Sequence, residues 1–396
     1  MIYCNECVYP AVAVLLDIGG DGTCSACRAH KEFSNLSEES WNQKKELFKE
    51  LIFKHKGKSY YDCVIPVSGG KDSYYQAHII CEKYNLKPLL VTYDHNNWLP
   101  EGEHNRNQMK KKFDADHITW SPSEKVLKKL NRLSFEKIGD MNWHDHCGIM
   151  TAPVIVATRF KIPLMIWGES PWDISGQFGP DDMVNFTNRS RHENSLRGYE
   201  WYDFINDKNN PLTEKDMAWA KYPTDEEILS VGVTGIYIGS YFKWSGKKNA
   251  ELSIKKYDWQ PSKTPFERTY RNYSNVDNRY SNGVSDMLKF IKFGYGRSSD
   301  HVSKDIRNGE MIREDGIKLI KKYDPVISSD LSHFLEYVEL KETDFWKIAD
   351  KFRDPRVWII KNKQWYKDNI WGEESAYGDV YLNKNEQENF NIRKKI

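Results

Sequence analysis

The sequence predicts an α/β fold, in which helices cover both faces of a doubly wound parallel sheet. Short apolar runs alternate with helical patterns between residues 61 and 167, as is typical of parallel strands joined by helices. A glycine-rich turn, Ser68–Ser73, directly follows the first apolar run, at the edge where such sheets bind ligands. The 396 residues are enough for this sheet and a second region.

The expected elements of the sheet region follow in chain order. An amphipathic helix over residues 36–55 comes first. The apolar runs predicted to be strands are Tyr61–Val67, Pro88–Tyr93, His117–Trp120 and Pro163–Trp167. The patterns predicted to be helices are Ser73–Asn85, His104–Phe113 and Ser123–Ile138, and the segment from there to residue 162 is mixed.

The alternation ends after about residue 205, and the last part of the chain is predicted to be mainly helical. One further strand is expected within Val231–Tyr241. Helices are expected over Val284–Phe293, Lys304–Tyr323 and Glu342–Phe352, the last with Thr343-Asp344 as its cap. The expected organisation is a knuckle over 1–30, a helical linker over 31–58, a nucleotide-binding domain over 59–205 and a substrate-binding region over 206–396.

The charge balance and hydropathy pattern exclude several classes of protein. With 58 Lys+Arg against 57 Asp+Glu, the net charge is +1, which argues against a dedicated nucleic-acid binder. No apolar run reaches the roughly 18 residues of a membrane span. The first residues lack the basic flank and apolar core of a signal peptide. We therefore expect a cytoplasmic protein without a membrane partner.

Four of the seven cysteines form two CxxC pairs, Cys4 with Cys7 and Cys24 with Cys27. Two such pairs supply the four thiolates of a closed tetrahedral Zn²⁺ site, and glycines before the second pair permit the required turn. The odd total argues against a disulfide framework. The sequence predicts a structural zinc knuckle; a redox dithiol pair or unliganded thiols are the alternatives.

The turn Ser68–Ser73 has the composition of a phosphate-binding loop. Gly69 and Gly70 let the backbone approach a phosphate, Ser68 and Ser73 add hydroxyl donors, and Lys71 adds a positive charge. A nucleoside-triphosphatase loop needs Ser or Thr after its Gly-Lys, and this sequence has Asp72 there. An acid beside phosphates is best explained by a Mg²⁺ ion. The alternative is an ordinary glycine turn between strand and helix.

The loop resembles the SGGxDS motif of the PP-loop ATP pyrophosphatases, which have the adenine nucleotide alpha hydrolase-like fold. The resemblance implies that the segment from Val67 to Ser73 holds the pyrophosphate of ATP, with AMP and pyrophosphate as products. It also implies that Thr92 and Tyr93 contact the adenine. Gly168 and Glu169 would form a third wall of the nucleotide site.

The chain is similar over most of its length to the N-acetyl sugar amidotransferase family. The segments that carry this resemblance are Cys4–Cys7, Cys24–Cys27, Ser68–Ser73, Ile162–Glu169 and Lys292–Arg297. Family members serve bacterial surface-polysaccharide (lipopolysaccharide) and flagellin sugar pathways. They are described as converting the acetamido group of an N-acetylated sugar, such as an activated uronic or nonulosonic acid, into an acetamidino group.

This reaction assigns roles to the candidate residues. An amide oxygen must become a leaving group before ammonia can replace it. Attack of this oxygen on the α-phosphorus of ATP achieves this, because the oxygen can then leave with AMP. Lys71 and Asp72 would stabilise the pyrophosphate, directly and through Mg²⁺. Glu169, with Asp173 as a weaker candidate, would orient the amide or ammonia; an ion pair is its alternative role. Arg297 would bind an acidic group of the sugar, or else form a surface ion pair at a helix cap.

The ammonia source is expected to be another protein or free ammonium. No glutaminase motif is present, because Met1 is followed by Ile2 and the residues around Cys147 do not form a nucleophile elbow. The resemblance implies a separate glutaminase, similar to the subunits of imidazole glycerol phosphate synthase. His144, His146 and Cys147 suggest a second metal site on a strand or turn; solvent-facing or substrate-binding histidines are the alternative.

Two other functions remain as alternatives. A tRNA thiolation enzyme shares the phosphate loop, but it usually has paired reactive cysteines and a basic surface; here Cys63, Cys81 and Cys147 are unpaired in sequence. A non-catalytic, nucleotide-sensing zinc-knuckle module is the second alternative, which the intact loop Ser68–Ser73 argues against. The identity of the sugar, its activation state and the assembly state are not determined by the sequence.

Overall fold

A central sheet organises the structure, a computed structural model that describes residues 1–169, 175–278 and 281–394. Its strand order is β3-β2-β1-β4-β6-β5. All neighbours are parallel except β5, which pairs antiparallel with β6. The strands are β1 (Cys63–Pro66), β2 (Pro88–Tyr93), β3 (Asp116–Trp120), β4 (Leu164–Trp167), β5 (Asn185–Phe186) and β6 (Thr234–Tyr237). The predicted α/β class with a mainly parallel sheet is confirmed.

Helices cover both faces of this sheet because its strands are apolar on both sides. In β1, Cys63 and Ile65 face a core formed with α2, α3, α4 and α9, whereas Val64 faces α6. The covering helices are α2 (Glu38–Phe53), α3 (Lys71–Ala77), α4 (Pro100–Lys112), α6 (Trp143–Arg159) and α9 (Gly246–Tyr257). The order of strands reverses between β1 and β4, which is where open α/β sheets bind ligands.

Two features of the sheet region differ from expectation. The segment that the sequence left as mixed is helix α6, which the glycine and proline within it obscured. Gly148 is required there, because a Cβ at this position would lie 2.2 Å from the ring of Tyr93. Strand β6 is the strand expected within Val231–Tyr241; it pairs with β4, so the sheet continues past residue 205, the expected end of the nucleotide-binding domain.

The C-terminal region is mainly helical, but it also holds a small sheet that the sequence did not predict. Strands β7 (Ile359–Lys361), β8 (Gln364–Asp368) and β9 (Glu374–Asp379) are antiparallel. These strands are short and partly polar, so their pattern gave no signal. The helices are α10 (Ser281–Phe293), α11 (Arg297–Arg307), α12 (Arg313–Tyr323), α13 (Leu331–Tyr337), α14 (Glu342–Lys351) and α15 (Lys384–Arg393).

Two details of these helices correct the sequence predictions. The helix expected over Lys304–Tyr323 is two helices, separated by a turn in which Gly309 has φ +70°. Thr343-Asp344 lies inside the first turn of α14, and Lys341 is the N-cap. The remaining helical elements are α1 (Ser25–Ser34), α7 (Asn188–Ser190), α8 (Asp225–Val231) and the short turns His78–Lys83, Arg191–Ser195, Trp201–Phe204, Glu214–Ala220 and Ile238–Ser240.

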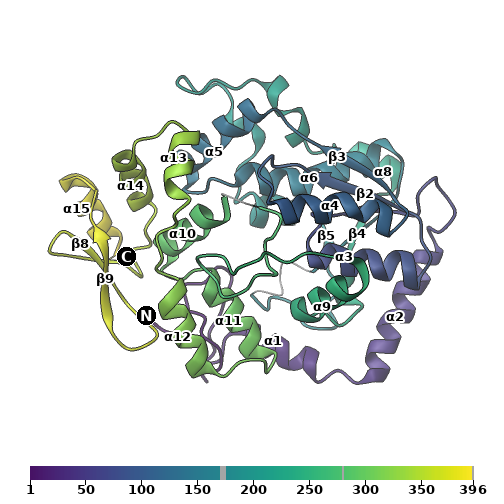
Figure 1. The fold of residues 1–396 in the computed structure, drawn as a ribbon, viewed down its shortest axis with the longest axis horizontal. Helices are drawn as coiled ribbons and strands as arrows, with labels where there is room; N and C mark the ends of the chain where they lie inside the picture. Colours follow the sequence, from purple (N-terminus) through teal and green to yellow (C-terminus); the bar gives the residue numbers. More distant parts are fainter. Residues whose placement is uncertain (170–174, 279–280, 395–396) are drawn as a thin grey trace.

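The N-terminal knuckle packs on the C-terminal region rather than on the sheet (Figure 1). The terminal amine of Met1 pairs with Asp368 at 3.2 Å, and Arg313 of α12 donates to the carbonyl of Cys7 at 2.8 Å. From there the chain runs through α1 and α2 to the far side of the molecule and enters the sheet. In the described part of the chain, no helix combines the length and apolarity needed to cross a membrane.

Candidate active site at the carboxyl edge of the sheet

The predicted phosphate loop joins β1 to α3 in a compact turn. The backbone N–H of Ser68 donates to Ser73 Oγ at 3.0 Å, and the N–H of Gly70 donates to Ser68 Oγ at 3.2 Å. Gly69 has φ +80°, and a Cβ there would lie 2.7 Å from the backbone of Arg106 in α4. Only glycine fits this position, because of both its φ and the close approach. Val67, the residue before the loop, is buried against the sheet core.

Helix α9 holds the two charged residues of the loop. Lys71 Nζ pairs with Asp72 Oδ2, and Asn249 Nδ2 donates to Asp72 Oδ1 at 2.8 Å. Ser253 Oγ donates to the carbonyl of Lys71 at 3.2 Å. Sequence reasoning missed Asn249 and Ser253, because α9 lies far along the chain in a segment without a recognisable motif.

The side chain of Asp72 fits the expected magnesium ligand. It is 34% exposed, so part of the carboxylate faces solvent beside the loop. A carboxylate offers about four lone-pair sites, and the bonds from Lys71 and Asn249 use only some of them. The carboxylate can therefore accept a hard cation between itself and phosphate oxygens.

The end of β2 forms a second wall, in which the predicted side chains are turned inward. Thr92 Oγ1 donates to the carbonyl of Val67 at 2.6 Å, and Tyr93 Oη lies 3.2 Å from His144 Nδ1. Because both side chains are buried, only the backbone at this strand end could contact the expected adenine base.

Asp94, the next residue, is a carboxylate with several partners, and sequence reasoning missed it. It accepts hydrogen bonds from Ser121 Oγ and Trp98 Nε1, both at 2.6 Å, and pairs with Arg106 at 3.3 Å. Burial alone would raise the pKa of Asp94, but the hydrogen bonds from Ser121, Trp98 and the backbone of Asn96, together with the charge of Arg106, lower it. The ion pair with Asp94 holds the side chain of Arg106, whose backbone packs against Gly69.

A third wall follows β4 and reaches the C-terminal region. Glu169 Oε1 pairs with Lys304 Nζ of α11, and Trp244 Nε1 donates to Glu169 Oε2 at 3.2 Å. Gly168 packs against Trp244: a Cβ at this position would lie 3.3 Å from the indole ring. Glu169 thus joins the sheet edge to α11. Asp173, the weaker candidate for this wall, lies outside the described residues.

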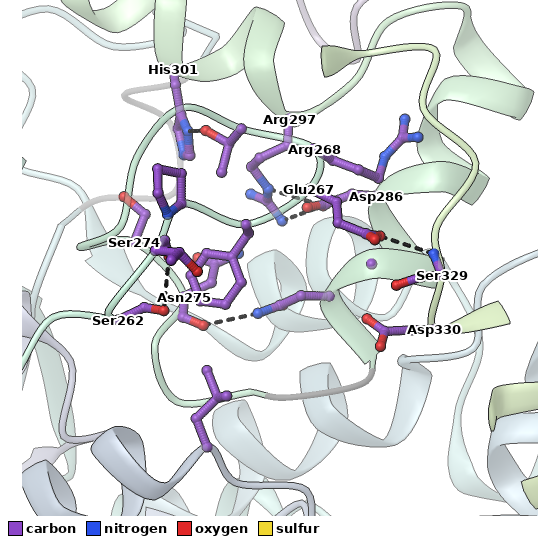
Figure 2. Close-up of a pocket in the computed structure, with 17 residues that line it drawn as sticks. Ser262, Glu267, Arg268, Ser274, Asn275, Asp286, Arg297, His301, Ser329 and Asp330 are labelled. Atoms are coloured by element: carbon purple, nitrogen blue, oxygen red, sulfur yellow. Dashed lines mark hydrogen bonds and ion pairs between the residues drawn. The ribbon is translucent and has the colours of Figure 1, made fainter. Parts of the chain in front are cut away.

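Arg297, the first residue of α11, lines a cavity of about 320 Å³ (Figure 2). Its Nε and Nη2 lie 2.9 and 2.8 Å from Asp286 Oδ1, so both groups of the fork are directed at a protein carboxylate. Burial raises the pKa of Asp277, and the charges of Lys71 and Arg297 oppose this shift. The backbone of Asp277 packs against Gly102 of α4.

The four N-terminal cysteines form a buried group with zinc geometry. The Sγ atoms of Cys4 and Cys27 are 3.9 Å apart, those of Cys7 and Cys24 are 3.7 Å apart, and all four lie within 4.8 Å of one another. Tetrahedral Zn–S bonds of about 2.3 Å place sulfurs about 3.8 Å apart. Among the described residues, no other group of three or more His, Cys, Asp or Glu has metal-binding geometry.

The expected strand or turn at His144, His146 and Cys147 is wrong, because these residues lie in the first turns of α6. The three side chains have separate partners. Burial lowers the pKa of His144 to about 3, whereas His146 lies 3.8 Å from Asp140. The thiol of Cys147 is buried beside Thr151, and burial raises its pKa to about 12. Of the three, His144 contacts Tyr93, and the side chain of His146 is 42% exposed.

Comparison with known proteins finds a family match for one part of the chain. The family model described as "LPS biosynthesis protein WbpG-like, C-terminal domain" matches residues 267–370. No curated protein matches the chain. The matched segment contains Asp277, Arg297 and Lys304, together with most of the residues that line the cavity. Residues 267–370, called the WbpG-like domain below, are therefore similar to the C-terminal domain of WbpG-like LPS biosynthesis proteins, which supports the resemblance to the sugar amidotransferase family.

Proposed function

We propose that the protein is an AMP-forming, ATP-dependent amidotransferase of bacterial surface-glycan biosynthesis. Its substrate is an N-acetylated, nucleotide-activated sugar, and its product carries an acetamidino group. The acetamido oxygen attacks the α-phosphorus of ATP and pyrophosphate leaves; ammonia then adds to the amide carbon, and AMP leaves with that oxygen. The WbpG-like match supports the pathway, and the phosphate loop supports the use of ATP.

The contact between the WbpG-like domain and the sheet edge is the observation that carries this proposal. The ion pair of Lys304 with Glu169 joins α11 to the end of β4. The backbone of Asp277 packs against Gly102 of α4, the helix whose Arg106 packs against Gly69 of the loop. A segment related to LPS biosynthesis therefore meets the edge where a phosphate loop lies. A nucleotide on the loop and a sugar on the domain would be neighbours.

Each loop residue then has a defined task. Lys71 and the Gly69-Gly70 backbone stabilise the negative charge of the departing pyrophosphate, which is usually the largest contribution in such reactions. Asp72, oriented by Asn249, holds Mg²⁺, which neutralises phosphate charge when bound. Glu169 orients the amide or the incoming ammonia from the facing wall.

The thiols argue against the tRNA thiolation alternative. Burial raises the pKa of Cys63 above its ordinary value, and it raises the pKa of Cys81 and of Cys147 to about 12. Thiolate character is what makes a cysteine reactive, so these three are poor sulfur carriers. The ammonia source in the proposal is a separate glutaminase similar to imidazole glycerol phosphate synthase subunits, or free ammonium.

The test is a product assay with defined substrates. The protein is incubated with Mg-ATP, ammonium and a panel of nucleotide-activated N-acetyl sugars. AMP release and the small mass decrease from replacing O by NH are then measured. Asp72→Asn is expected to abolish AMP release while retaining zinc and fold. Failure across the panel, together with AMP formation on tRNA and a sulfur donor, would contradict the proposal.

A further inference from the structure

The N-terminal knuckle contacts α11 on the helix face that also carries Lys304. Tyr9, which is 1% exposed, donates from its hydroxyl to Asp300 Oδ1 at 3.1 Å. The guanidinium of Arg307 lies 5.5 Å from the centre of the Tyr9 ring. Asp300, Lys304 and Arg307 are spaced at i, i+4 and i+7, so they share one face of the helix. The knuckle therefore packs against the face from which Lys304 pairs with Glu169.

The knuckle also holds the chain that follows the third wall. Ser25 Oγ donates to the carbonyl of Ser175 at 2.5 Å, and both residues are buried. Gly176 has φ +66°, and a Cβ there would lie 2.6 Å from the Cα of Ala26. Ser25 and Ala26 lie inside the second CxxC pair, so a bound zinc would fix the turn that makes this contact.

These two contacts restrain both members of the ion pair between Glu169 and Lys304. Lys304 lies one turn along α11 from Asp300, the residue to which Tyr9 donates. Ser175 is six positions beyond Glu169 in the chain. Six residues span at most about 22 Å, so anchoring Ser175 on the knuckle restricts where Glu169 can lie.

The phosphate loop is held by other parts of the chain. The backbone of Arg106 in α4 packs against Gly69, and Asn249 of α9 donates to Asp72 at 2.8 Å. Both helices are separate from the knuckle in the chain. A change in the knuckle should therefore affect the wall that contains Glu169 and leave the nucleotide loop in place.

We propose that the zinc knuckle positions the ion pair of Glu169 with Lys304 in the candidate active site. Tyr9 and Ser25 are its positioning residues, because they act through α11 and through the chain after β4. The metal would contribute by fixing the turns of the knuckle, because four thiolates leave no open coordination position for a substrate. The effect on sugar turnover rests on the proposed function, whereas the effect on the position of Glu169 does not.

The first measurement uses neither ATP nor sugar. Trp244 Nε1 donates to Glu169 Oε2 at 3.2 Å, so the indole N–H signal of Trp244 in NMR reports on this contact. The protein is labelled with nitrogen-15 tryptophan, and Trp244→Phe assigns the signal. Tyr9→Phe and Gly176→Ala are expected to shift or broaden the signal while both variants retain their zinc. Gly198→Ala is the matched control, with φ +79° and nothing within 4 Å of its Cβ, and should leave the signal unchanged.

The second measurement separates the sugar from the nucleotide. In Tyr9→Phe and Gly176→Ala, kcat/KM for the N-acetylated sugar is expected to decrease at least about threefold, because small misplacements of an orienting group are costly. The calorimetric Kd for Mg-ATP is expected to stay unchanged, which a general loss of folding would not allow. If the unaltered protein has no amidotransferase activity, the proposed function fails, and the indole signal still tests this inference.

Three results would overturn the proposal. They are an unchanged Trp244 signal in the knuckle variants, an equal change in Gly198→Ala, and a Mg-ATP affinity that falls in parallel with kcat/KM for the sugar. Tyr9→Phe removes only a hydroxyl, so it decides the question if Gly176→Ala does not fold.

Discussion

Replacing Asn249 with alanine tests whether α9 orients the acid that would hold magnesium. Asn249 is 2% exposed, and its amide donates to Asp72 Oδ1 at 2.8 Å. A hydrogen bond to a charged group contributes about 1.5–3 kcal/mol. Because Lys71 still pairs with the other oxygen of Asp72, we expect a loss at the lower end of this range.

This loss corresponds to roughly a tenfold decrease in kcat/KM for Mg-ATP, since about 1.4 kcal/mol is tenfold in rate. The assay is AMP formation at varied Mg-ATP, together with calorimetric binding of Mg-ATP. The effect should be larger when Mg²⁺ is limiting, because a disordered Asp72 holds the ion less well.

Lys248→Ala is the matched control, since Lys248 is the preceding residue on α9 and its side chain is exposed. It should leave both measurements unchanged. Thermal unfolding separates a local effect from a loss of fold. If Asn249→Ala binds and uses Mg-ATP as well as the unaltered protein does, Asp72 does not need this contact, and the assignment of α9 to the site is wrong.

Three further predictions test the knuckle, the loop and the buried histidines. Cys24→Ser should lose the bound zinc in metal analysis, whereas Cys81→Ser should retain it. Cys24→Ser should also speed hydrogen exchange in α11, because Tyr9 of the knuckle donates to Asp300 of that helix at 3.1 Å. Gly69→Ala should lower the free energy of unfolding in urea by more than Gly57→Ala: both sites have positive φ, which costs about 1–2 kcal/mol, but only Gly69 has a backbone neighbour at 2.7 Å. Lowering the pH from 6.5 to 5 should destabilise the protein by up to about 2 kcal/mol through His144, because the unfolded chain binds a proton there that the buried ring, with its pKa of about 3, does not. His144→Gln should flatten this part of the stability profile by about one proton, and an unchanged slope would contradict the assignment.

Local patterns were enough to predict the knuckle and the strand–turn–helix unit around Ser68–Ser73. The CxxC spacing and the Gly-Gly turn each express a constraint within a few residues, so a single sequence reveals them. The alternation of apolar runs predicted the sheet for the same reason. Helix α6 and the strands β7 to β9 were missed, because glycine, proline and polar residues hide the period of a segment whose conformation is set by packing.

Only the tertiary structure brought distant residues to the site. Asn249 contacts Asp72 and Lys304 contacts Glu169, and each of these pairs joins segments far apart in the chain. Arg297 pairs with Asp286 of the preceding helix, α10. The sequence by itself determined which residues have the chemistry to hold phosphate and zinc, because that chemistry depends on residue type and local spacing. The structure decided which of those groups are engaged by protein partners, because partners are set by long-range packing. That packing also placed the knuckle on the WbpG-like domain and formed a cavity at the N-terminus of α4, the helix whose Arg106 packs against Gly69 of the phosphate loop.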